Sequence, residues 1–159
     1  MSESKFKTLR HIETVRNYLN KVISELLDRS EHHDKTKLES PEAEQFEKYT
    51  PLLRDTTYGS DKYKKYMGEM SVAIKHHNEH NSHHPEHFIN GIHDMTLIDL
   101  IEMLCDWKAA TLRHNDGDII RSIDINQQRF GYSNELKNIL VNTANWINSQ
   151  RVFHKAIES

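Results

Sequence analysis

The amino-acid sequence predicts an all-α protein with a single domain, and three observations support this fold class. Glycine and proline are scarce, with five and three among 159 residues. Apolar residues recur at three- and four-residue steps along most of the chain, which is the periodicity of amphipathic helices. Ser or Thr residues that can cap a helix precede several of these segments. The low hydrophobic content, 36%, therefore reflects long polar outer faces rather than disorder.

The first predicted element is a long helix over residues 6–28, where apolar residues alternate with Arg, Asn, Lys and Glu. His11 lies four residues before Val15 and eleven before Val22. These steps place His11 on the apolar side of the helix. We therefore expect His11 to flank or enter the core-facing stripe.

Two short helices are predicted next. Ser30 is the expected N-cap of a helix that carries the adjacent pair His33-Asp34. Ser40-Pro41-Glu42 is a second start signal, with Ser at the N-cap, Pro at the first helical position and an acid in the first turn. This helix is expected to end near Tyr49, because the residue before Pro51 is restricted to extended conformations. Residues 50–60 then form a loop.

The remaining elements begin at recognisable caps. Ser60 caps a helix from about residue 61 to His80, and Pro85 forces a corner at His84 before a short helix that ends at Asn90-Gly91. Thr96 and Asp99 resemble a capping box. That box predicts a helix over 97–114. Two packing helices follow over 118–130 and 133–150.

Bulk composition excludes several classes of protein. The net charge is -3, so the chain offers no general basic surface for nucleic acid. The single cysteine, Cys105, lies in an apolar run where a buried, inert thiol is expected. The first residues lack the apolar stretch of a signal peptide, and no window resembles a membrane span. These features predict a cytoplasmic protein that does not bind membranes.

Histidine is the residue type that points to chemistry. The chain has 12 histidines, and seven of them lie between positions 76 and 93. His76 and His80 are one helical turn apart, and His77 neighbours His80 at three residues. Imidazoles together with carboxylates, and almost no thiols, are a ligand set for zinc, manganese, iron, nickel or cobalt ions.

The order of these residues resembles the HD superfamily of metal-dependent phosphohydrolases. The resemblance covers roughly residues 5–115 and implies a helical bundle of about six to eight helices, with 118–150 as packing helices in one domain over 1–159. It implies a first ion held by His11, His33, Asp34 and Asp106. It implies that Asp34 bridges to a second ion, whose candidate ligands are His76 or His77, His80, and His83 or His84. Lys37 falls at the family's lysine position, suited to a phosphate oxygen.

A closer likeness is to a family of uncharacterised bacterial and phage proteins. It is carried by the segments HHDKTKL, HHNEHNSHHPEHF and DLIEMLCDWKAATLRH. This likeness implies no known activity, and it implies the host cytoplasm if the chain is phage-encoded. The surplus of histidines departs from ordinary HD enzymes and leaves the second ion's ligands open.

The leading hypothesis is a phosphohydrolase that acts on a nucleotide or another small phosphoester through a metal-activated water, with Asp34 and Lys37 as the catalytic candidates. Glu79 and Glu86 are candidates to orient ligand imidazoles. Two alternatives remain. One is a di-iron protein, either hemerythrin-like or an oxygenase variant of the HD fold. The other is a non-catalytic, metal-binding interaction protein. The sequence leaves homo-oligomerisation open.

Overall fold

The computed structural model describes residues 2–54, 56, 60–113 and 117–150. Within these ranges every regular element is a helix, seven of them α-helices and three of them short 3-10 helices. The predicted all-α class is therefore confirmed. Among the described residues, no helix is long and apolar enough to cross a membrane.

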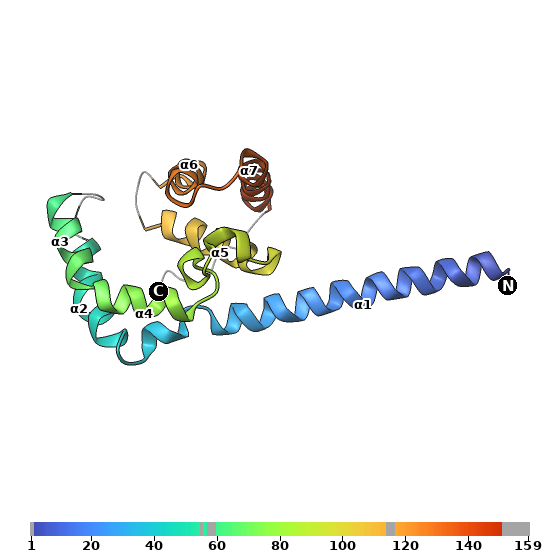
Figure 1. Cartoon of the computed structure of the whole chain (residues 1–159), viewed down its shortest axis with the longest axis horizontal. Helices are drawn as coiled ribbons and strands as arrows, with labels where there is room; N and C mark the ends of the chain where they lie inside the picture. Colours follow the sequence, from blue (N-terminus) through green and yellow to red (C-terminus); the bar gives the residue numbers. More distant parts are fainter. Residues whose placement is uncertain (1, 55, 57–59, 114–116, 151–159) are drawn as a thin grey trace.

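The first helix, α1 (Glu3–His32), extends far beyond the rest of the molecule (Figure 1). The Ser2 hydroxyl caps its N-terminus by accepting a hydrogen bond from the Lys5 amide. The predicted boundary at Ser30 was wrong, because the Ser30 hydroxyl donates to the Leu27 carbonyl inside the same helix and begins no new one. A single helix therefore leads directly to His33, which is its C-cap.

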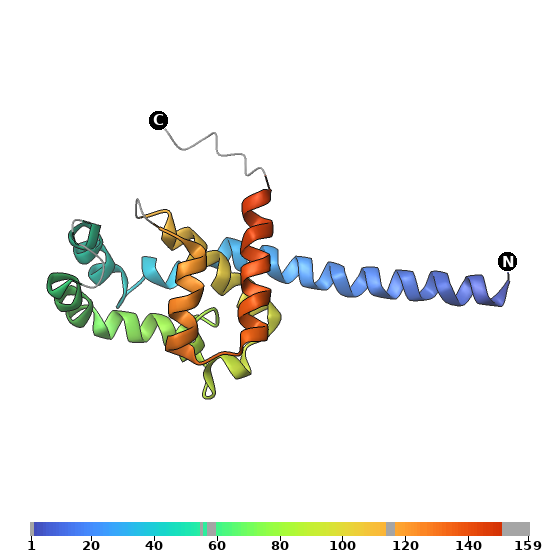
Figure 2. The same cartoon turned by 90° about the horizontal axis from the view of Figure 1, so that it is seen from above.

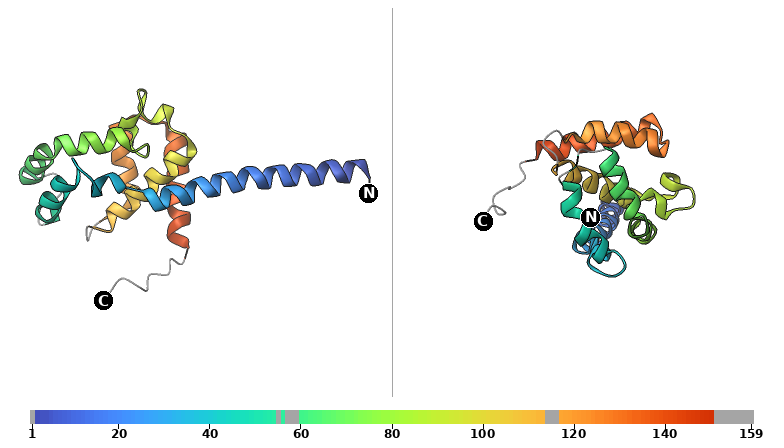
Figure 3. Two further views of the ribbon diagram at one scale, coloured as in Figure 1. Left: turned by 90° about the horizontal axis from the view of Figure 1, so that it is seen from below. Right: turned by 90° about the vertical axis from the view of Figure 1, so that its left-hand side faces the viewer.

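Most of α1 has no neighbour among the described residues. Its C-terminal part packs against α5, and the remainder projects as one long helix (Figure 3, left). None of its residues is buried. The expectation that its apolar stripe faces the core was therefore wrong, and His11 is exposed with the rest of that stripe.

The chain after α1 forms a 3-10 helix, η1 (Lys35–Leu38), and then α2 (Ala43–Arg54). The predicted start at Ser40-Pro41 was two residues early, because residues 40–42 form a turn. The predicted stop before Pro51 was also wrong, since Pro51 lies inside α2. Its ring removes one backbone donor at the start of the last turn, yet the helix continues to Arg54.

The predicted helix over 61–80 is two helices, α3 (Asp61–Glu69) and α4 (Ser71–His80). Ser60 caps α3 as expected, since its hydroxyl accepts from the Tyr63 amide. The break is at Met70, a residue that is almost fully buried. Two 3-10 helices follow, η2 (Pro85–His87) and η3 (Gly91–Asp94). His84 precedes η2 in an extended conformation, as the position before Pro85 requires.

The hydrophobic core lies between the last three helices: α5 (Leu97–Thr111), α6 (Ile119–Phe130) and α7 (Asn134–Ser149). The capping box predicted at Thr96 and Asp99 is present in full. Figure 2 shows α6 and α7 side by side, joined by a turn in which Gly131 adopts a left-handed φ of 69°. The predicted end of α5, His114, lies outside the described residues.

Candidate metal centre

Five segments bring histidines and carboxylates together. The end of α1 supplies His33 and the following turn supplies Asp34. The last turn of α4 supplies His77, and the corner before η2 supplies His83 and His84. The middle of α5 supplies Asp106 from the side that faces α1.

The first group consists of His33, Asp34 and Asp106. One potential ligand atom from each lies within 4.8 Å of the other two. His33 Nε2 is 3.6 Å from Asp34 Oδ2 and 3.8 Å from Asp106 Oδ1. One imidazole and two carboxylates at this separation are a suitable partial ligand set for a divalent cation.

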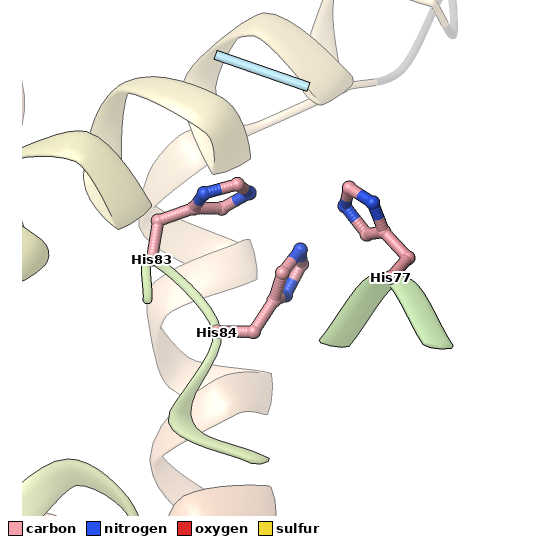
Figure 4. Close-up of side chains that lie close together, drawn as sticks. All are labelled: His77, His83 and His84. Atoms are coloured by element: carbon pink, nitrogen blue, oxygen red, sulfur yellow. The ribbon is translucent and has the colours of Figure 1, made fainter. Parts of the chain in front are cut away.

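The second group consists of His77, His83 and His84, again within 4.8 Å of one another. Figure 4 shows the three rings facing a common space, one from α4 and two from the corner. The ring centroids of His83 and His84 are 4.2 Å apart, and those of His77 and His84 are 4.8 Å apart. The predicted turn before Pro85 therefore brings both parts of the histidine cluster together.

Asp34 lies between the two groups. Its Oδ1 atom is 3.2 Å from His77 Nε2 and 3.5 Å from His83 Nε2, whereas its Oδ2 atom faces His33 and is 2.5 Å from Lys37 Nζ. Asp34 adopts a left-handed φ of 58°, which is unfavourable for a residue with a side chain but better tolerated by Asp than by most. Such backbone strain is concentrated at functional sites.

Four buried atoms in this region have no hydrogen-bond partner among the described residues: Asp34 Oδ1, His77 Nε2, His83 Nε2 and His84 Nε2. An unsatisfied buried polar group costs about 1–3 kcal/mol. Three such imidazole nitrogens and a carboxylate oxygen around one space are therefore costly without a shared partner. A divalent cation would satisfy all four, so the residues present fit a metal ion.

Two glutamates, one half-buried and one fully buried, accept hydrogen bonds from the Nδ1 atoms of three of these imidazoles. Glu102 Oε1 lies 2.9 Å from His33 Nδ1 and 3.2 Å from His83 Nδ1, so it contacts one ligand of each group. Glu42, which is completely buried, accepts from His77 Nδ1 at 2.9 Å. Because a carboxylate only accepts hydrogen bonds, each Nδ1 carries a proton, and Nε2 is the atom that could bind an ion once any proton on it is released.

These glutamates were missed from the sequence, and the predicted ones were wrong. The Glu79 carboxylate faces Lys75, and Glu86 pairs with Arg129 at 2.6 Å. One signal did exist for Glu102. It lies four residues before Asp106 in the same apolar helix, so the two acids share one face.

Arg29 on α1 pairs with two acidic residues of α5, one of which contacts the site. One of its guanidinium nitrogens lies 3.0 Å from Glu102 Oε2 and 2.7 Å from Asp99 Oδ1. Asp99 also completes the capping box of α5. A single arginine on α1 therefore fixes the start of α5 and the glutamate that orients His33.

The pKa values of the histidines differ because their partners differ. The nearby Asp106 carboxylate and the hydrogen bond to Glu102 raise the pKa of His33 to about 10. Burial, together with repulsion from His83 and His77, lowers the pKa of His84 to about 3. Burial alone would raise the pKa of Asp34, but His77, His83 and Lys37 hold it well below its usual range. The His84 imidazole is therefore neutral throughout the physiological pH range.

Three predicted ligands lie outside both groups. His11 is 22 residues before His33 on the same helix, which places it about 33 Å away at 1.5 Å per residue. His76 donates to Glu42 from outside, and His80 Nδ1 bonds to the His76 carbonyl. Their rings stack 4.0 Å apart, away from the three rings of the second group. Neither His11 nor His80 is brought to the site.

A groove of about 390 Å³ between α1 and α5 adjoins the first group, and both His33 and Asp106 line it. Apolar side chains form much of the remaining wall: Leu26, Ile101, Cys105 and Ala109. Cys105 is exposed in this groove, so the expectation of a fully buried thiol was wrong. Partial burial, with Glu102 and Asp106 nearby, raises the pKa of Cys105 and disfavours its reactive thiolate.

Comparison with known proteins places the chain in a family. Residues 1–151 match the model of the Family of unknown function (DUF5662), and the chain belongs to that family. No curated protein and no solved structure matches the chain.

Proposed function

We propose that this member of a family of unknown function is a metal-dependent phosphohydrolase that acts on a nucleotide or another small phosphoester. The observation that carries the proposal is the position of Asp34. Its two oxygens face two different groups of potential ligands, and one of those groups has three unpartnered buried imidazole nitrogens. A carboxylate between two such groups suits a pair of divalent ions about one bridging ligand.

The donor set indicates which ions fit. Three imidazoles beside a carboxylate suit zinc, iron, nickel or cobalt, and the group with two carboxylates also suits manganese. Ions bound there would lower the pKa of a coordinated water and stabilise negative charge on a phosphoryl group. The HD resemblance assigns His11, His33, Asp34 and Asp106 to a first ion and Lys37 to a phosphate oxygen. This arrangement brings together all of these residues except His11.

The protein's own residues have separable tasks in this proposal. Glu102 and Glu42 fix the tautomers of His33, His83 and His77, so that their Nε2 atoms face the ions. The Lys37 ammonium donates a hydrogen bond to Asp34 Oδ2 and lies over the Phe46 ring. These two contacts hold the ammonium beside the site. There it partly offsets the carboxylate charges and offers a donor to a phosphate oxygen.

The groove beside His33 and Asp106 is the proposed substrate position. Its volume of about 390 Å³ lies within the range of small-molecule sites, and its apolar walls suit the non-phosphate part of a phosphoester. A phosphoryl group at the first metal group would leave a nucleobase or similar apolar part between α1 and α5.

The test begins with the metal content of the purified protein and continues with a panel of phosphoesters. We expect about two metal equivalents per chain, and release of phosphate or nucleoside that Asp34→Asn abolishes. His80→Ala is the matched control, because it removes a neighbouring histidine that lies outside both groups and should leave turnover unchanged. A metal-loaded protein that cleaves no member of the panel would contradict the proposal. A coloured, iron-loaded protein would favour the redox alternative.

A further inference from the structure

The N-terminal part of α1 presents an apolar surface that nothing in the described chain covers. Nine large apolar side chains of this helix are 41–63% exposed, namely Phe6, Leu9, Ile12, Val15, Tyr18, Leu19, Val22, Ile23 and Leu27. Exposed apolar patches of this extent mark interaction surfaces. A lone helix is also only marginally stable in water, because its stability in proteins comes mainly from packing.

The spacing of this stripe identifies its partner as another helix. Ile12, Leu19 and Leu26 recur every seven residues, and Val15 and Val22 follow the first two by three residues. This is the heptad pattern, with alternating steps of three and four, that packs one helix against another in a coiled coil. This heptad pattern runs for two heptads, from Ile12 to Leu26, and reaches the groove beside α5, which Leu26 lines.

The charges on α1 indicate how that partner is oriented. Residues 3–16 carry four basic and two acidic side chains, whereas residues 17–32 carry two basic and three acidic ones. The N-terminal half is therefore net positive and the C-terminal half net negative. Two copies of this helix complement each other only when they run antiparallel, an arrangement that helix dipoles also favour.

We propose that α1 is a dimerisation helix that pairs antiparallel with α1 of a second copy of the chain. Seven of the nine side chains, all except Phe6 and Leu27, lie at heptad positions that face or flank a partner helix. At about 100 Å² for each, the stripe offers about 700 Å² per copy, close to the area of about 800 Å² per partner in a stable interface. Antiparallel pairing puts the two sets of helices α5–α7 at opposite ends of the joined helices. It leaves each copy with its own metal centre.

The first experiment measures the mass of the full-length protein in solution by size exclusion with light scattering. We expect about twice the chain mass of 18.8 kDa. The double substitution Ile12→Lys and Leu19→Lys should restore the single-chain mass, because it places charges at the centre of the stripe. The matched control is Asn17→Lys with Ser24→Lys, which adds the same charges on the opposite, already polar face and should leave the mass doubled.

Metal binding provides the check on folding, since the substituted positions are about 20–30 Å from His33 along the helix. The stripe variant should bind metal like the parent protein while it is monomeric. A monomeric parent protein, or a dimer that the stripe variant does not disrupt, overturns the proposal. Association with lipid vesicles or a foreign peptide by a monomeric parent would assign the stripe to that partner instead.

The second experiment tests the orientation with spin labels. Cys105→Ser removes the native thiol, and Lys7→Cys introduces a label on the outer face near the helix start. In the antiparallel pair, the two labels are about 30 Å apart, because residue 7 lies about ten residues from the middle of the stripe on each copy. In a parallel pair, the labels would be about 10–15 Å apart, the separation of neighbouring helices plus side chains, and that result would overturn the proposed orientation.

Discussion

Glu102 allows the proposed two-ion arrangement to be tested without removing a ligand. Its carboxylate contacts the Nδ1 atoms of His33 and His83, which belong to different groups. Glu102→Gln keeps the shape of the side chain but removes its negative charge, and it leaves one amide oxygen as acceptor in place of two carboxylate oxygens. Loss of such an orienting contact costs about 10- to 100-fold in metal affinity, or about 1.4–2.7 kcal/mol. Because both groups lose this contact, both metal equivalents should bind more weakly.

The assay is competition with a chromophoric chelator, which resolves the two binding steps. Glu42→Gln should weaken one step only, since Glu42 contacts His77 of the second group and no residue of the first. Glu25→Gln is the control, because Glu25 also pairs with Arg29 but touches neither imidazole. If Glu102→Gln binds both equivalents within about threefold of the parent protein, Glu102 does not orient the ligands and the reasoning is refuted.

Three further predictions follow from the same contacts. Metal binding at pH 6 should release about two protons. The raised pKa values of His33 and His83 keep both imidazoles charged in the free protein, whereas a ligand imidazole must be neutral. Calorimetry in buffers of different ionisation enthalpy measures the proton release, and a metal affinity that does not fall with falling pH would contradict the prediction. Chelation of both metal equivalents should lower the melting temperature by about 10–20 °C, since each ion at about 100 times its Kd contributes about 2.7 kcal/mol. Ile123→Ala should cost about 2–5 kcal/mol in urea unfolding, because Ile123 is fully buried in the α5–α7 core, and it should leave metal stoichiometry unchanged.

Local signals in the sequence located the C-terminal helices well. The capping box at Thr96 and the cap at Ser133 are satisfied by residues only three positions away. Such contacts depend on neighbouring residues alone, so the sequence determines them directly. The same holds for the corner at His84, which the next residue, Pro85, imposes.

Long-range geometry explains where the predictions were wrong. Periodicity is the same in one long helix and in two collinear ones, so it did not show that α1 continues through Ser30. The straight course of α1 separates His11 from His33, although their order in the sequence suggested a shared ion. In the sequence, Glu42 is recognisable only as the acid of a helix start signal, and its burial against His77 reveals its role at the site.

The surplus of histidines has a physical explanation in this geometry. On α4, His76 and His77 are adjacent and therefore point in different directions, yet both donate to the two oxygens of Glu42. His77 uses its other nitrogen inside the second group, whereas His76 stacks on His80 outside it. His76 thus helps to hold the glutamate that orients His77, whereas His80 contacts His76 and not Glu42. A cluster that resembles one large ligand set is therefore divided into three inward-facing imidazoles (His77, His83 and His84), one outer imidazole, His76, that supports His77 through Glu42, and His80, which stacks on His76.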